Sequence, residues 1–225
     1  MELRLDGTHY PLETLGPGKR LGIWFQGCTL ACAGCMSRHT WDPDAGTAAT
    51  VPEVLGLWRR ALADGADGLT VSGGEPLQQS RALAHLLAGA ARLRDGARRH
   101  EGSAGSRPAD LLVYTGYDPE ELTPGRRRAL DGADAVITGR FRVAEPTRLA
   151  WRGSANQRIV PLTPLGATRY APYLTRESPG PRLQPAPGPD GALRLYGVPL
   201  RGELAALESR LGKDGVALTE RSWRP

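Results

Sequence analysis

A repeated alternation of strand-like and helix-like segments in the middle of the chain is the feature that most constrains its fold. Three apolar runs have the composition of buried strands: residues 68–72, 111–115 and 134–138. Residues 51–63 and 79–93 carry apolar side chains at helical spacing, and residues 119–130 predict a broken helix. Strands that alternate with helices favour parallel pairing, so we predict an α/β fold, as a layer or an incomplete barrel.

Other segments fall outside this alternation. Residues 2–5 and 21–25 predict two further strands, and residues 94–109, whose only apolar side chains are alanines, predict a mobile surface loop. The prolines and glycines of residues 172–191 predict a segment without backbone pairing. The last unit is predicted as a strand at 193–196, a helix at 203–211 and a strand at 215–218. We therefore divide the chain into a core domain at 1–165, a linker or strap at 166–191 and a small C-terminal α+β appendage at 192–225.

Composition and charge limit the location and the partners of the chain. It has 225 residues, a formal net charge of +5 and a pI of about 9.4. The arginine runs are not interleaved with aromatic residues, which favours a solvated basic surface over a nucleic-acid interface. The first residues show no signal-peptide pattern, and no run approaches the roughly 20 apolar residues of a membrane span. We therefore expect a cytoplasmic protein with no membrane partner.

All three cysteines of the chain, Cys28, Cys32 and Cys35, lie within one short segment. This clustering favours a shared ligand over a disulfide framework, because three thiols cannot all pair. Three thiolates can each hold one iron of a [4Fe-4S] cluster and leave the fourth iron open to an outside ligand. The spacing alone leaves two alternatives open, a closed zinc site completed by His39 and ordinary free thiols.

A glycine-rich turn follows the strand predicted at residues 68–72. Gly73 and Gly74 allow a ligand to approach the backbone, since neither has a side chain. Glu75 supplies a carboxylate that can receive the ammonium group of a bound amino acid. By itself the sequence Gly-Gly-Glu-Pro is equally well a plain strand-to-helix turn. Ligands of parallel sheets bind at the carboxyl ends of strands, however, where this turn and the cysteine loop are expected to meet.

Four segments taken together resemble a known family. They are residues 16–35 with the cysteines, SGGEP at 72–76, YTGY at 114–117 and WRGSANQRI at 151–159. The combination covers about two thirds of the chain and resembles the radical S-adenosylmethionine (SAM) activating enzymes. It is most similar to the activases of anaerobic ribonucleoside-triphosphate reductase. Met36 stands where these activases often have asparagine, and the residues after Pro164 are additional to a minimal activase.

The resemblance implies a partial (β/α) barrel of the radical SAM type, with a [4Fe-4S] cluster and SAM as cofactors. The implied metal ligands are Cys28, Cys32 and Cys35. The implied SAM-binding residues are Gly34, Met36, Gly73, Gly74, Glu75 and Tyr117. A flavodoxin or ferredoxin would reduce the cluster, and SAM cleavage would give a 5'-deoxyadenosyl radical. In the activase branch this radical abstracts hydrogen from a glycine Cα of a partner such as anaerobic ribonucleotide reductase.

Several residues near these motifs have two interpretations each. Arg20 would meet the SAM carboxylate or an acidic electron donor, or would lie on the surface. Asn156 and Gln157 would recognise a partner's backbone or close over the cavity, or would satisfy the amides of their own loop. Three functions therefore remain: a glycyl-radical activase, a radical SAM enzyme acting on a peptide or small metabolite, and a zinc-stabilised binding module.

Overall fold

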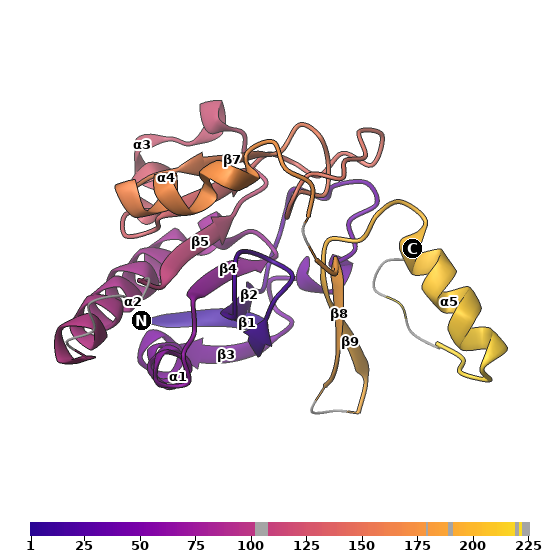
Figure 1. The fold of residues 1–225 in the computed structure, drawn as a ribbon, viewed down its shortest axis with the longest axis horizontal. Coiled ribbons are helices and arrows are strands. Elements are labelled where there is room, and N and C mark those ends of the chain that lie inside the picture. The colour runs from indigo at the N-terminus through magenta and orange to yellow at the C-terminus, as the bar shows by residue number, and fades with distance from the viewer. Residues whose placement is uncertain (102–107, 179, 189–190, 219–220, 222–225) are drawn as a thin grey trace.

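The computed structural model describes residues 1–101, 108–178, 180–188, 191–218 and 221. Its main element is a seven-stranded mixed sheet with the order β3-β1-β2-β4-β5-β6-β7 (Figure 1). The strands are β1 (Glu2–Leu12), β2 (Arg20–Phe25), β3 (Thr47–Thr50), β4 (Gly68–Gly73), β5 (Asp110–Tyr114), β6 (Ala135–Thr138) and β7 (Arg158–Pro161). The predicted α/β class is confirmed.

The centre of the sheet is parallel and its two sides are antiparallel. Strands β2, β4, β5 and β6 run in one direction, whereas β1, β3 and β7 are antiparallel to their neighbours. In the described residues the order begins at β3 and ends at β7, so the strands form an open layer and closure into a barrel is not confirmed. Because Phe25 pairs with Gly73 at the carboxyl ends of β2 and β4, the cysteine loop and the glycine turn start side by side.

Two long helices, α1 (Val51–Ala63) and α2 (Ser80–Glu101), pack against each other and against the sheet. Thr50 caps α1 in a capping box with Glu53, as its position before the apolar repeat predicts. The buried Trp58 of α1 donates from Nε1 to the carbonyl of Ala90 in α2 at 3.1 Å. None of the described helices is long and apolar enough to span a bilayer.

Helix α2 continues beyond its predicted end, so the loop predicted at residues 94–109 is wrong for residues 94–101. Arginine occupies three of these eight positions, and arginine, alanine and glutamate are strong helix formers even without larger apolar side chains. Arg94 also ties the helix to the sheet through Asp134, with Nη1 and Oδ2 2.7 Å apart. Residues 102–107, also predicted as loop, lie outside the described residues.

The remaining helices of the core are short. They are η1 (Arg38–Thr40), η2 (Pro76–Gln79), η3 (Pro119–Glu121), α3 (Pro124–Ala129), α4 (Pro164–Tyr170) and η4 (Ala171–Tyr173). The broken helix predicted at residues 119–130 is confirmed as η3 and α3. Thr123 separates the two, and its hydroxyl accepts from Arg126 N as the N-cap of α3.

A buried ion pair connects the amino ends of the parallel strands β2 and β5 and closes this end of the sheet to solvent. Arg20 at the start of β2 is fully buried and donates from Nη1 and Nη2 to the two carboxylate oxygens of Asp110, both at 2.9 Å. Its Nε donates to Thr70 at 2.6 Å, and Tyr170 of α4 donates to Asp110. Both interpretations of Arg20 are therefore wrong, because the start of β2 places it inside the protein, at the end of the sheet opposite the cysteine loop.

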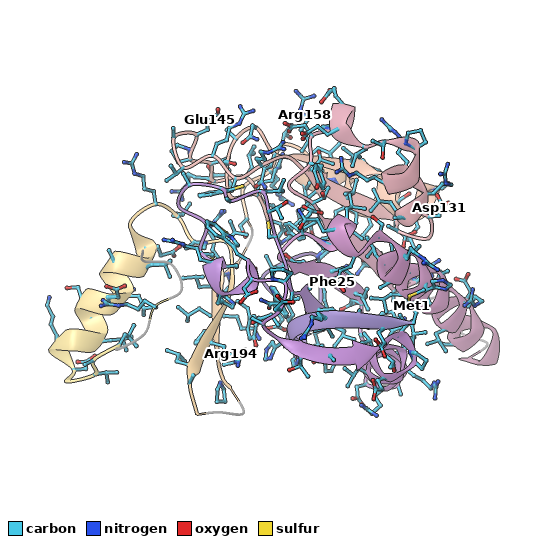
Figure 2. All side chains as sticks on the ribbon, turned by 180° about the vertical axis from the view of Figure 1, so that it is seen from behind. Met1, Phe25, Asp131, Glu145, Arg158 and Arg194 are labelled. Carbon is cyan, nitrogen blue, oxygen red and sulfur yellow. The ribbon has the colours of Figure 1, made fainter. Side chains whose placement is uncertain are left out.

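The C-terminal part forms a two-stranded sheet of β8 (Leu183–Pro187) and β9 (Leu193–Gly197), followed by α5 (Glu203–Lys213). Figure 1 shows this hairpin and α5 beyond the main sheet, and Figure 2 shows Arg194 on the hairpin, apart from Phe25 in the sheet. The absence of pairing predicted for residues 172–191 is wrong at β8, because a strand paired on one side tolerates proline. Residues 179 and 189–190 lie outside the described part.

The strand predicted at residues 215–218 is also wrong. Gly215, with φ of +78°, ends α5 in the left-handed conformation. Val216 N then donates to Leu211 O at 2.8 Å, which uses the backbone of this segment to close the helix end. The predicted strand at 193–196 and helix at 203–211 correspond to β9 and α5.

Candidate active site

The cysteine loop leaves the sheet at the carboxyl end of β2, and backbone hydrogen bonds close its base. Gly27 N donates to Thr40 O at 2.7 Å, and Cys28 N donates to Trp41 O at 3.0 Å. The side-chain amide of Gln26 donates to two further carbonyls of the loop. These bonds give the loop a fixed base beside the sheet, so its cysteines stand at the edge where β2 ends.

The three cysteines are the predicted ligands of a shared iron-sulfur cluster. Cys28, Cys32 and Cys35 are free thiols of intermediate exposure, and Cys35 N donates to Cys32 O at 3.2 Å. Burial raises the pKa of the Cys28 and Cys32 thiols above the usual range. A bound metal reverses this tendency, because coordination deprotonates a thiol. Three soft donors from one loop match three corners of a four-iron cube.

The zinc alternative requires His39 as a fourth ligand, and this ring has another partner. Its Nε2 lies 3.5 Å from Oδ2 of Asp6 in β1. In the described part of the chain, no three His, Cys, Asp or Glu side chains are gathered as ligands of a single ion. The arrangement therefore gives no support to a closed Cys3His zinc site.

The glycine turn is packed directly against the base of the cysteine loop. Gly73 has φ of +110°, and a Cβ there would lie 2.3 Å from Phe25 N. A Cβ on Gly74 would lie 2.3 Å from Gly27 O, which accepts a hydrogen bond from Glu75 N at 2.8 Å. Close approach of the protein's own backbone therefore accounts for both glycines. Their contact with SAM stays a prediction.

A side-chain pair joins the same two segments a second time. Thr29 N of the cysteine loop donates to Oε1 of Gln78 in η2 at 3.2 Å, and Gln78 Nε2 donates to the Thr29 hydroxyl at 2.7 Å. The cysteine loop and the glycine turn are therefore one connected unit, although their residues are about fifty positions apart.

Glu75 is almost completely buried, with 1% of its surface exposed. Its Oε1 accepts from Leu77 N at 3.0 Å and from the Thr115 hydroxyl at 2.9 Å, and its Oε2 accepts from Gly116 N at 2.7 Å. Burial raises the pKa of this carboxyl, and the three hydrogen bonds oppose the rise. The structure thus gives Glu75 a positioning contact between the turns after β4 and β5. Its predicted contact with the SAM ammonium group stays a prediction.

Tyr117 lies in the core behind this turn. Its ring is buried, and the guanidinium of Arg126 lies 3.6 Å from the ring centroid. Nearby, Arg140 forms an ion pair with Glu121, and hydrogen bonding from Arg140 lowers the pKa of that carboxyl to about 2. Tyr114, at the end of β5 and three residues before Tyr117, lines the cavity described below, and its hydroxyl donates to Trp151 O at 3.0 Å.

Asn156 and Gln157 hold the loop that follows β6. Asn156 Nδ2 donates to Arg140 O and Gln157 Nε2 donates to Gly139 O, both at 2.9 Å. Gln157 Oε1 also accepts from Gly153 N at 2.7 Å. These bonds support satisfaction of their own loop, and Gln157 also lies in the lining of the cavity described below. Recognition of a partner's backbone stays a prediction.

A cavity of about 370 Å³ lies beside the cysteine loop. The cysteine loop contributes Gly34, Cys35 and Met36, in agreement with a site next to the third cysteine. Sequence reasoning missed several aromatic and aliphatic lining residues: Phe141, Val143, Trp151, Leu195, Tyr196, Val198 and Leu200. Trp151 opens the WRGSANQRI motif, but no short motif marks the others, because they come from separate loops and from the C-terminal part. The described lining is mostly apolar, which suits a site that excludes water.

A family model and several known proteins match the part of the chain that contains the cysteine loop and the glycine turn. A model of the family described as "4Fe-4S single cluster domain" matches residues 14–160. The anaerobic ribonucleoside-triphosphate reductase-activating protein of Pasteurella multocida is 36% identical over 166 residues, covering 69% of this chain and 96% of that protein. The protein of the same name from Enterobacteria phage T4 is 31% identical, covering 67% and 89%. Among solved structures, QueE from Escherichia coli has a TM-score of 0.40 and 17% identity, covering 64% of this chain and 74% of that one.

Proposed function

Because this chain belongs to the family of the anaerobic ribonucleoside-triphosphate reductase-activating proteins, which are radical SAM enzymes with a [4Fe-4S] cluster, we propose that it installs a glycyl radical in a partner enzyme. The partner class is an oxygen-sensitive glycyl radical enzyme such as an anaerobic ribonucleotide reductase. The observation that carries the proposal is the junction of the cysteine loop with the glycine turn beside an apolar cavity.

Each part of the site has a proposed role. A reduced [4Fe-4S] cluster supplies the electron that cleaves SAM into methionine and a 5'-deoxyadenosyl radical. Cys28, Cys32 and Cys35 hold three of its irons, and the fourth is left for the amino and carboxylate groups of SAM. The other proposed SAM-contacting residues are Gly34, Met36, Gly73, Gly74, Glu75 and Tyr117. Of these, Gly34 and Met36 line the cavity, whereas Glu75 and Tyr117 are buried and are not among its lining residues.

The apolar cavity serves the hydrogen transfer. A glycine Cα–H bond of the target breaks, its hydrogen atom forms the new C–H bond of 5'-deoxyadenosine, and the unpaired electron stays on the glycine. Apolar walls protect both radicals, because they keep bulk water away from them. A flavodoxin or ferredoxin is the proposed electron donor.

Three further features belong to this proposal. We assign the parallel strands to a partial barrel of the radical SAM type within a core domain at 1–165. Residues 166–191 and 192–225 are assigned as a strap and an appended unit. A cytoplasmic location suits the clustered free thiols, since reducing compartments keep thiols available for metal binding.

The test combines anaerobically reconstituted protein, a chemical reductant, SAM and a purified anaerobic ribonucleotide reductase. We expect formation of 5'-deoxyadenosine together with the electron paramagnetic resonance doublet of a glycyl radical in the reductase. A Cys32→Ala variant serves as the blank. Absence of 5'-deoxyadenosine would refute the radical SAM assignment for this chain.

A second candidate is a radical SAM enzyme that acts on a peptide or a small metabolite. It is favoured by the C-terminal segment, which forms one side of the cavity. Formation of 5'-deoxyadenosine without a glycyl radical in the reductase would select this candidate.

A further inference from the structure

We infer that residues 195–204 form a substrate-selecting wall of the cavity, which favours a target segment with apolar side chains next to the reacting carbon. The inference rests on the proposed function and adds a determinant of substrate choice to it. The wall contributes Leu195, Val198, Leu200 and Leu204 to the cavity lining. These side chains come from β9, from the start of α5 and from the segment between them.

The wall is fixed to the core on both sides. On one side, the Tyr196 ring stacks on His9 with centroids 4.4 Å apart and packs against Trp24 at 4.6 Å. Thr14 donates from its hydroxyl to Tyr196 O at 3.1 Å. These contacts join β9 to β1, β2 and the turn between them, so the wall is held against the sheet.

On the other side, Arg182 joins the wall to the loop after β6. Its Nε donates to Val198 O at 2.9 Å, and its Nη1 donates to Arg148 O at 3.0 Å. Gly197, with φ of +131°, brings the chain so close that a Cβ would lie 1.9 Å from Arg182 O. The segment therefore has a defined position over the cavity, which selection by shape requires.

The wall shares the cavity with the ends of the parallel strands. The lining also includes Cys35 and Met36 of the cysteine loop and Ser72 and Tyr114 at the ends of β4 and β5. SAM is assigned to these residues, because the proposed cluster ligands lie in the same loop. The wall enters from outside the main sheet (Figure 1), so it borders the space left for the substrate.

The wall also lies outside the part that this chain shares with its family. The family model ends at residue 160, whereas the wall begins at residue 195. The alignments include 96% and 89% of the two relatives described above but only 69% and 67% of this chain. A determinant in this additional part changes which target is accepted and leaves the cluster and SAM machinery of the family in place.

The chemistry of the lining sets the preference. Arg201, which is exposed, is the one charged side chain among the described residues that line the cavity. A positively charged group of the target placed inside would lose its hydration and would meet Arg201 but no carboxylate of the lining, whereas apolar groups gain from burial. The wall therefore selects against positively charged residues beside the target glycine.

The test uses two short peptides that contain α-deuterated glycine, flanked by valines in one and by lysines in the other. Deuterium that appears in 5'-deoxyadenosine reports hydrogen abstraction without depending on the identity of the partner enzyme. We expect the native protein to prefer the valine peptide by about tenfold or more. Equal transfer from both peptides, or no transfer from the valine peptide, would overturn the inference.

Two variants assign the preference to the wall. Leu200→Trp fills the cavity and is expected to reduce transfer from the valine peptide about tenfold, with SAM affinity unchanged. Leu193→Trp, on β9 but 49% exposed and outside the lining, is the matched control and should leave transfer unchanged. Equal transfer in Leu200→Trp and the native protein, or a parallel loss of SAM affinity in Leu200→Trp, would contradict a substrate-selecting role.

The same preparations separate this inference from the proposed function. If the peptides give the expected preference but the reductase acquires no glycyl radical, the wall is supported and the activase assignment fails. If the reductase is activated equally by the native protein and by Leu200→Trp, and the peptides are not discriminated, the activase assignment stands and the wall fails.

Discussion

The two ends of the parallel strands are built in opposite ways. At the amino ends, the fully buried Arg20 and Asp110 satisfy each other's charges through two hydrogen bonds of 2.9 Å. At the carboxyl ends, the three thiols are only partly buried, and a cavity of about 370 Å³ lies beside them. The protein uses one end of the sheet for stability and leaves the other for ligands.

The difference shows how the same sheet can be rigid and reactive. Polar groups at the amino ends are paired within the protein, so no ligand is needed to complete them. At the carboxyl ends, the three thiols lie on a loop with a fixed base and are not joined in disulfides. Mutations at the two ends should consequently separate stability from chemistry, and the following predictions test that separation.

The largest effect is expected from Cys32→Ala. Loss of one of three cluster ligands should remove iron and reduce SAM cleavage to background, since the loop has no replacement thiol. Iron and sulfide content and the yield of 5'-deoxyadenosine provide the measurement. Ala33→Ser, at an exposed position in the same loop, is the control and should keep both. Unchanged iron content in Cys32→Ala would show that the cluster does not depend on this loop.

Asp110→Asn should cause the largest loss of stability. It leaves the buried Arg20, whose pKa is raised by Asp110 despite burial, without its counter-charge. The expected decrease in the free energy of unfolding is about 3–5 kcal/mol, measured by urea denaturation at neutral pH. The surface substitution Asp64→Asn makes the same change of charge and should have little effect. A decrease below about 1 kcal/mol in Asp110→Asn would mean that the amino ends are not sealed by this pair.

The same pair predicts a dependence on pH. Burial would raise the pKa of Asp110, but the adjacent Arg20 lowers it below the usual value. The stability that Asp110 contributes is therefore present above its unfolded pKa of about 3.9 and is lost as pH falls through the lower folded value. Urea unfolding at decreasing pH measures the free energy of unfolding of the native protein and of Asp110→Asn. The difference between the two free energies should become smaller below about pH 4. If this difference stayed constant down to acidic pH, it would contradict a stabilising role of the ionised Asp110 carboxylate.

At the carboxyl ends, Glu75→Ala should weaken SAM binding about tenfold while iron content stays unchanged. The variant removes the acceptor of three hydrogen bonds, so the turns after β4 and β5 lose their connection. Equilibrium binding of SAM to the reconstituted protein measures the effect, and the exposed Glu120→Ala is the control. Bleaching of the cluster in Glu75→Ala would show instead that this carboxylate supports the cysteine loop itself.

The smallest effect is expected from Arg148→Ala. Its Nε lies 2.9 Å from Glu177 Oε2, but both side chains are more than 60% exposed, so water screens the pair. The free energy of unfolding should fall by less than about 1 kcal/mol in urea denaturation. A larger decrease would place this surface pair, rather than the sealed amino ends, among the main supports of the fold.

Sequence reasoning succeeded where local pattern decides structure. The cysteine spacing, the turn after β4 and the periodicity of α1 each lie within one segment, and the Thr50 cap follows from its own neighbours. The same reasoning failed for residues 94–101, where a helix without large apolar residues is held by Arg94 and Asp134. It also failed at β8, where pairing with β9 outweighs the prolines.

The sequence by itself determined the family, the cluster loop, the glycine turn and the α/β class, because these depend on residue types at short spacing. Only the tertiary structure decided that Arg20 seals the amino ends, that Glu75 connects two turns and that residues 195–204 reach the cavity. Each of these contacts joins segments far apart in the chain, and their meeting depends on how strands and loops pack rather than on any local pattern.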